Sequence, residues 1–223
     1  MKRFRLILCL MMLLAASCSK YDPALPMDSV ADGSPEFYRA DVVVTIKQDA
    51  DGTVFFQYGQ ERLYPGEGYP FERQCRAMAS VTIYAEEVPL YGHRVEVNWL
   101  VPLDEGAFKP YPEQGYGSDG IDILTKSWIT SLEDGYLTLH YKAWWGDPAA
   151  HHDFFLVQGS DPYELTLRHN ANGDEPAVYS EGTIYFDINS LPPTVDGPRK
   201  LKINWTTTEG NPVSAEFDFE TRT

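Results

Sequence analysis

The sequence predicts an all-β protein in which a small OB-like barrel is followed by an antiparallel β-sandwich. From residue 40 onward, short segments with alternating apolar and polar side chains recur along the chain. Turn dipeptides such as Asp51-Gly52 and Asp134-Gly135 separate these segments. The stretches between them lack the apolar periodicity of a helix. Short strands at close spacing with turn residues between them are typical of barrels and sandwiches.

The first 17 residues have the pattern of an export signal and are excluded from the fold. Lys2, Arg3 and Arg5 carry positive charge, and an uncharged apolar run follows from residue 6 to residue 14. The small residues 15–17 suit a signal-processing enzyme. Because the apolar run is shorter than the ~18–20 residues of a membrane-spanning helix, we expect residues 1–17 to be a cleaved signal peptide.

Cys18 follows Ala-Ala-Ser, an arrangement that resembles the bacterial lipobox. The resemblance implies that the Cys18 thiol is lipidated, that the chain is cut just before it, and that acyl chains such as palmitate anchor the protein. Ala15 stands where leucine is commonest, and an ordinary secreted protein is the alternative. Several acyl chains at ~0.8 kcal/mol per buried methylene give stable anchoring. We therefore predict an outer-membrane lipoprotein of the cell envelope, and the sequence leaves open whether it faces the periplasm or the surface.

The chain is strongly acidic, with a formal charge of −15 that becomes −18 once the three cations of the signal are removed. Such a charge repels nucleic acid and anionic membrane surfaces, so we expect no nucleic-acid partner. The plain explanation of the charge is solubility. Attraction to basic or divalent partners is the alternative.

The three cysteines predict no internal disulfide. Cys9 leaves with the signal and Cys18 is lipidated, so Cys75 has no partner. Arg73 and Arg76 could lower the pKa of the Cys75 thiol, but no histidine or asparagine partner is evident. We expect a buried, unreactive thiol.

The N-terminal half of the mature chain is expected to form a tether and a barrel. Residues 18–37 are rich in Pro, Asp, Ser and Gly, which is typical of a flexible tether. Residues 38–115 are expected to form the OB-like barrel, because about five strands in roughly 70 residues suit that fold. The expected strands span 40–47, 53–58, 62–64, 76–87 and 94–103.

The C-terminal half is expected to form the sandwich over residues 119–223. Residues 104–118 are rich in Pro, Gly and Tyr and are interpreted as the junction between the two units. About seven strands with one apolar face follow, which favours two packed antiparallel sheets. In one of them, Leu201, Ile203 and Trp205 alternate with polar neighbours, the period of a strand.

Several motifs of this half resemble the NigD-like lipoproteins. They are the segments 128–131, 134–139, 152–157 and 165–170 and the pair Gly173-Asp174. The lipobox and tether precede them as in that family. The resemblance implies an N-terminal OB-like domain and a C-terminal β-sandwich. The family takes its name from a protein encoded in a bacteriocin operon and suggested to confer immunity, and the resemblance implies no catalytic residues.

The sequence contains no nucleophile, phosphate-binding or zinc-protease motif, so we predict no enzymatic activity and no cofactor. Adjacent His151 and His152 point to opposite faces of a strand and cannot easily share an ion. His140, His152 and His169 could meet across a sheet. We expect structural histidines and no metal site.

Exposed aromatic residues are the best candidates for ligand binding. Trp144 and Trp145 must face opposite ways on a strand, so one is expected in the core and the other on the surface. Tyr111 and Tyr116 of the junction could stack on a sugar or peptide. We expect a non-enzymatic lipoprotein that binds an unidentified macromolecule. The alternatives are a glycan-binding accessory protein and a hydrolase with an unrecognised site.

Overall fold

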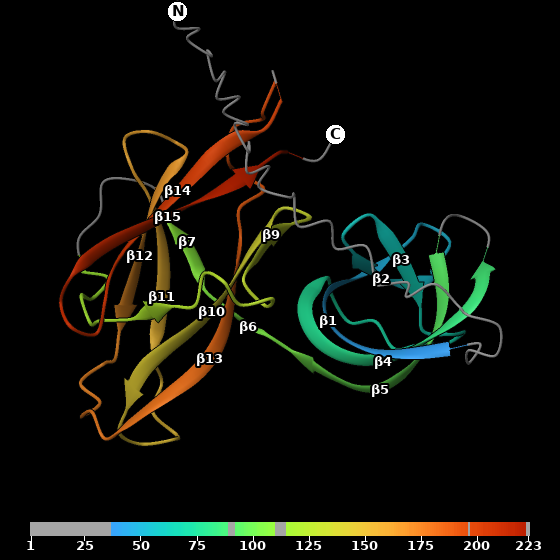
Figure 1. Ribbon diagram of the computed structural model, residues 1–223, viewed down its shortest axis with the longest axis horizontal. Helices are drawn as coiled ribbons and strands as arrows, with labels where there is room; N and C mark the ends of the chain where they lie inside the picture. The colour runs from blue at the N-terminus through green and yellow to red at the C-terminus, as the bar shows by residue number, and fades with distance from the viewer. Residues whose placement is uncertain (1–36, 89–91, 110–114, 196, 222–223) are drawn as a thin grey trace, which may run out of the picture.

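The computed structural model describes residues 37–88, 92–109, 115–195 and 197–221 (Figure 1). All regular elements in these ranges are strands, which confirms the predicted all-β class. No helix in this part of the chain is long and apolar enough to cross a membrane. The predicted signal peptide, Cys18 and Tyr111 lie outside the described residues, as does nearly all of the predicted tether.

The N-terminal unit is a closed five-stranded barrel with the order β1-β2-β3-β5-β4. Its strands are β1 (Phe37–Gln48), β2 (Val54–Tyr58), β3 (Glu61–Tyr64), β4 (Cys75–Val88) and β5 (Gly92–Pro102). The long β1 closes the barrel because it pairs with β2 through its C-terminal end and with β4 along most of its length. This is the OB-like barrel that the sequence predicts.

The apolar run of β1 reflects burial on both faces. Val42 and Val44 point into the barrel core with Phe56 and Leu63. Thr45, on the opposite face, is fully buried as well, because the sandwich covers this side of the barrel. A strand with one solvent face alternates between apolar and polar residues, whereas a strand that is covered on both faces does not.

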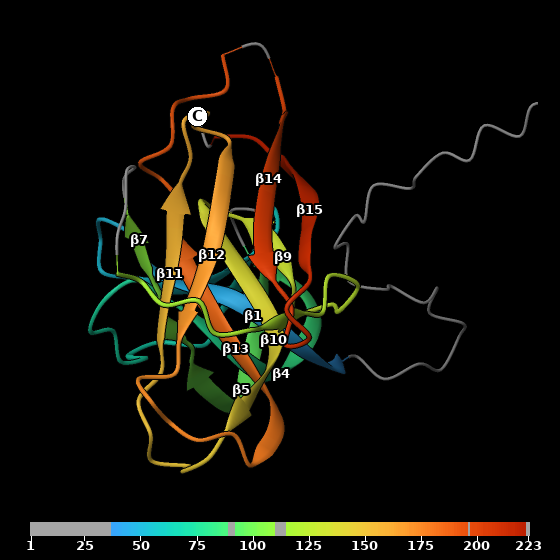
Figure 2. The ribbon, with the colours of Figure 1, turned by 90° about the vertical axis from the view of Figure 1, so that its left-hand side faces the viewer.

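The C-terminal unit is a sandwich of two five-stranded sheets (Figure 2). The first sheet contains β6 (Asp104–Glu105), β13 (Val178–Asp187), β10 (Tyr136–Trp145), β8 (Asp122–Ile123) and, paired with β10, β9 (Ser131–Glu133). The second contains β15 (Pro212–Phe219), β14 (Arg199–Thr206), β12 (Glu164–Asn170), β11 (Asp153–Gln158) and β7 (Ala107–Lys109). Fully buried side chains between the sheets, among them Leu139, Leu156 and Phe186, form the core.

Two details of the predicted sandwich are wrong. The sheets are mixed, because β6 pairs with β13, β7 with β11 and β12 with β14 in parallel. Residues 104–109, assigned from the sequence to the barrel domain of residues 38–115, form β6 and β7 and belong to the sandwich. These two short strands lack the length over which an alternating pattern becomes visible.

Gly106 lets the chain change sheets within one residue. It lies between β6 in one sheet and β7 in the other, and its N–H donates to the carbonyl of Tyr185 at 2.8 Å. A Cβ atom at this position would lie 2.1 Å from the ring of Phe186. Only glycine therefore fits this close approach to the core.

Candidate functional site: a groove between the two domains

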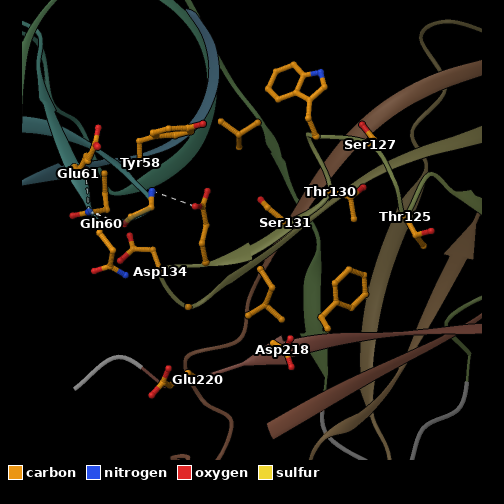
Figure 3. A pocket seen from close by; sticks show the side chains of 18 of the residues that line it. Tyr58, Gln60, Glu61, Thr125, Ser127, Thr130, Ser131, Asp134, Asp218 and Glu220 are labelled. Atoms are coloured by element: carbon orange, nitrogen blue, oxygen red, sulfur yellow. Dashed lines mark hydrogen bonds between the residues drawn. The ribbon is translucent and has the colours of Figure 1, made fainter. Parts of the chain in front are cut away.

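A groove of about 1050 Å³ lies where the barrel meets the sandwich (Figure 3). The barrel supplies one wall through Tyr58, Gln60 and Glu61, at the turn from β2 to β3. The sandwich supplies the other wall through residues between 125 and 135, which lead into and include β9. Asp218 and Glu220, near the C-terminal end of the described chain, line a third side.

The groove is acidic and carries aromatic side chains. Five carboxylates and a single lysine, Lys126, line it. Its aromatic members are Tyr58, Trp128 and Phe217, of which the Trp128 side chain is nearly half exposed. A partner for this surface should combine positive charge with apolar groups.

Arg76 fixes the two walls relative to each other. Its side chain is fully buried, and its guanidinium contacts Glu133 of β9 at 2.6 Å. The same group donates to Thr45 Oγ1 of the barrel at 3.0 Å, and to Thr138 Oγ1 of the sandwich at 3.2 Å. One side chain of β4 is thus hydrogen-bonded across the domain interface on several sides, the arrangement that a buried charge requires.

Further polar contacts cross the same interface. Lys47 of the barrel binds Asp134 at 2.9 Å, and the Asp134 side chain is only 3 % exposed. The second oxygen of Glu133 accepts a hydrogen bond from the backbone N–H of Gly59 at 3.3 Å, at the edge of the groove. Gln74 donates to the Tyr136 hydroxyl at 2.7 Å. These contacts fix the two walls to each other and neutralise two of the five groove carboxylates, Glu133 and Asp134. A third, Asp218, pairs with Lys200 at 2.7 Å.

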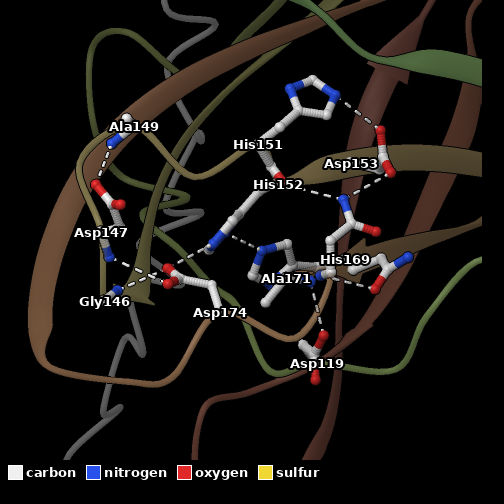
Figure 4. Close-up of polar contacts among 12 residues, drawn as sticks. Asp119, Gly146, Asp147, Ala149, His151, His152, Asp153, His169, Ala171 and Asp174 are labelled. Atoms are coloured by element: carbon white, nitrogen blue, oxygen red, sulfur yellow. Dashed lines mark hydrogen bonds and ion pairs between the residues drawn. The ribbon is translucent and has the colours of Figure 1, made fainter.

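Of the three histidines that could meet across a sheet, the structure brings two together (Figure 4). His152 Nδ1 lies 2.9 Å from His169 Nε2, and both residues are buried. His140 contacts Ser127 and Glu181 instead. In the ranges that the structure describes, no three His, Cys, Asp or Glu side chains are grouped to hold a metal ion.

The hydrogen bonds of this pair define where His169 carries its proton. The Gly120 carbonyl can only accept, so His169 Nδ1 carries a proton and His169 Nε2 accepts one from His152 Nδ1. His152 Nε2 lies 3.2 Å from the Asp174 carboxylate on its other side. Burial lowers the pKa of His169 and so favours its neutral form.

The carboxylate of this network is held ionised by its donors. Hydrogen bonds from the backbone N–H groups of Gly146 and Asp147 and from His152 lower the pKa of Asp174. The ring of Trp145 stacks on His152 at 3.7 Å between centroids. Neither histidine of the pair bonds a hydroxyl or thiol among the described residues, so the network ties loops of the sandwich together rather than activating a nucleophile.

Cys75 is buried in the barrel core. Burial raises the pKa of its thiol despite the positive charge of Arg73 nearby. A thiol with these properties is a poor nucleophile near neutral pH.

The structure separates the predicted aromatic candidates. Trp145 packs inward against His152, whereas Trp144 is 45 % exposed. Tyr116 packs on Phe155 at 4.6 Å and is partly buried, and Tyr111 lies outside the described residues. The sequence did not point to the groove or to Arg76, since a lone arginine on a strand ordinarily indicates a solvent face.

Residues 105–219 match the model of the NigD-like C-terminal β-sandwich domain, which is more than half of the chain. The chain belongs to the NigD-like family. The matched range begins at β6, so it agrees with the observed start of the sandwich rather than with the predicted one at residue 119. Curated proteins provide no match.

Several solved structures from Parabacteroides and Bacteroides species have a similar fold. A candidate toxin-related protein of Parabacteroides distasonis is 24 % identical, covers 82 % of this chain and 94 % of its own, and has a TM-score of 0.70. A NigD-like immunity protein of Bacteroides caccae is 16 % identical over 81 % of this chain and 97 % of its own, with a TM-score of 0.55. A candidate lipoprotein of Bacteroides fragilis is 16 % identical over 83 % and 99 %, with a TM-score of 0.56. At these identities the likeness establishes the fold.

Proposed function

We propose that this NigD-like protein is a non-catalytic lipoprotein of the cell envelope that binds a basic segment of a partner protein in the interdomain groove. The observation that carries the proposal is a groove whose walls are fixed by a fully buried arginine. A preformed site loses little conformational entropy when its partner binds. Charge supports the choice of a basic partner, because the five carboxylates of the groove exceed by one the sum of Lys126 and the three cations paired with Glu133, Asp134 and Asp218. The whole chain is also acidic.

The relatives support a protein as the occupant. One structural neighbour is described as an immunity protein and another as a candidate toxin-related protein. A role in binding a protein would need a complementary surface rather than catalytic groups. One hydroxyl of the groove is paired with a base, since Ser127 Oγ lies 2.8 Å from His140 Nδ1 and His140 Nε2 lies 3.2 Å from Glu181. Ser127 Oγ also accepts a hydrogen bond from the backbone N–H of Ile129. A hydrolase that uses Ser127 is therefore the second candidate function, and loss of hydrolysis of ester probes in Ser127→Ala would favour it over binding.

In this proposal, lipidation at Cys18 anchors the protein in a membrane of the cell envelope. The lipobox-like signal and the candidate lipoprotein among the structural neighbours both favour lipidation at this cysteine. With labelled palmitate, we expect incorporation into the wild-type chain and none into Cys18→Ala, which should also leave the membrane fraction. Equal incorporation into both would refute anchoring at Cys18.

Photo-crosslinking in living cells tests the groove itself. A benzoylphenylalanine at position 128, where an exposed tryptophan lines the groove, should crosslink to one protein. The same group at position 99 is the matched control, since Trp99 is equally exposed but does not line the groove. Crosslinking that weakens with added salt at position 128 alone supports the proposal, because salt screens exposed charges. Equal crosslinking at both positions, or none at position 128, contradicts it.

A further inference from the structure

Away from the groove, a second surface on the sandwich carries exposed aromatic rings. Trp144 lies near the end of β10 and is paired in register with Tyr179 near the start of β13. The two side chains are 45 % and 41 % exposed, and their ring centroids lie 5.3 Å apart with a 41° tilt. Figure 1 shows this end of β10 at the edge of the sandwich that is remote from the barrel.

The Tyr179 ring is held in place although it faces solvent. The Tyr179 hydroxyl donates to Asp122 at 2.5 Å, and Asp122 also accepts from Thr208. Lys142 lies 5.9 Å from the centre of the Tyr179 ring and is held by Glu181 at 2.8 Å. Because the Tyr179 side chain is already ordered, a ligand that binds it causes little further loss of side-chain conformational entropy.

The size of the surface argues against a protein partner. Aromatic side chains offer roughly 150–250 Å² each, so the exposed fractions leave roughly 150–200 Å² of open ring surface. A stable protein interface buries about 800 Å² on each partner. The ring surface instead matches one or two sugar rings.

The chemistry around the rings suits a carbohydrate. A pyranose ring has an apolar C–H face that stacks on aromatic rings and hydroxyls around its rim that both donate and accept hydrogen bonds. Lys142 supplies donors and Glu181 supplies acceptors beside the rings, and both are partly exposed. The carboxylates of Glu181 and Asp122 outnumber the single ammonium group, which disfavours acidic sugars.

From these observations we infer that Trp144 and Tyr179 form a stacking platform for a neutral, pyranose-based glycan. The platform is independent of the proposed function, because none of its residues lines the groove. A cross-strand aromatic pair that merely stabilises the sheet would bind no sugar.

The test is a titration of the full chain, purified in a zwitterionic detergent without a sugar headgroup. The probes are cellotetraose, chitotetraose and maltotetraose at millimolar concentrations, followed by the indole N–H resonances in ¹H–¹⁵N NMR spectra. We expect at least one probe to shift the Trp144 resonance in a saturable manner. With Kd values measured by isothermal titration calorimetry for the wild type and the variants, Trp144→Ala should raise the Kd by about tenfold or more, equivalent to ~1.4 kcal/mol.

Two further variants complete the design. Trp128→Ala removes an exposed tryptophan of the groove and should leave the Kd unchanged. Tyr179→Ala removes the second ring and should weaken binding as Trp144→Ala does, which provides an independent test should one variant fail to fold. The inference is overturned if none of the three probes shifts Trp144 saturably, or if both platform variants bind as the wild type does.

Discussion

The buried ion pair between Arg76 and Glu133 should contribute strongly to stability, and its removal is the sharpest test of the domain interface. Arg76→Met keeps most of the side-chain volume but deletes the contact of 2.6 Å to Glu133 and the bonds to Thr45 and Thr138. Breaking a buried pair by removing one partner costs about 3–5 kcal/mol. Glu133 keeps 20 % of its side chain exposed and still accepts from Gly59, so we expect the lower end of that range.

Scanning calorimetry measures this effect. For a protein of this size, 1 kcal/mol lowers the Tm by about 2–4 °C, so Arg76→Met should lower it by about 6–12 °C. The matched control is Arg73→Met, which deletes an exposed pair with Glu105 at 3.1 Å and should lower the Tm by less than about 3 °C.

A double-mutant cycle separates the pair from the packing around it. Replacing both partners, as in Arg76→Met with Glu133→Leu, removes both charges and should cost about 2 kcal/mol less than the sum of the single changes. If Arg76→Met costs no more than Arg73→Met, or if the single changes simply add, Arg76 does not join the domains as argued.

Three further predictions concern the core and the buried network. The pKa of His169 is lower in the folded chain than in the unfolded chain, so on acidification the unfolded chain binds a proton at this residue before the folded chain does. The free energy of unfolding should therefore begin to fall as the pH drops below about 6.5. The lowered pKa of Asp174 should cause a further loss below about pH 3.9, and urea midpoints measured across this range should show both steps. Gly106→Ala should lower the free energy of unfolding by about 1–3 kcal/mol, measured in urea, because its Cβ would press on Phe186; an unchanged midpoint would contradict the close approach. Cys75 should react with a thiol reagent only after unfolding, and fast reaction of the native protein would contradict its burial.

The sequence predicted the fold class because its strands are long enough to show their period. In β14, Leu201 and Ile203 alternate with lysine and asparagine, and both are buried in the core. The same rule predicted that Trp144 and Trp145 point to opposite faces of their strand, although it could not say which of the two faces the core. Two-residue and three-residue strands such as β6 and β7 show no period, so the start of the sandwich was placed too late.

The groove could not be predicted, because it depends on how two separate units meet. The charge of Arg76 favours a solvent-facing side of β4, and only the sandwich packed over it makes the side chain buried. Its partner Glu133 lies more than fifty positions further along the chain, in a strand of three residues. No local pattern connects two such residues.

The most direct test of a preformed groove is the distribution of distances across it in solution. Spin labels at Gln60 on the barrel wall and Lys126 on the sandwich wall, in a chain of residues 18–223 with Cys18→Ser and Cys75→Ala, report this distance by pulsed electron spectroscopy. We predict a single narrow distribution that broadens when Arg76→Met is added. A distribution already broad before Arg76 is replaced would show that the two domains move freely, and it would contradict the account.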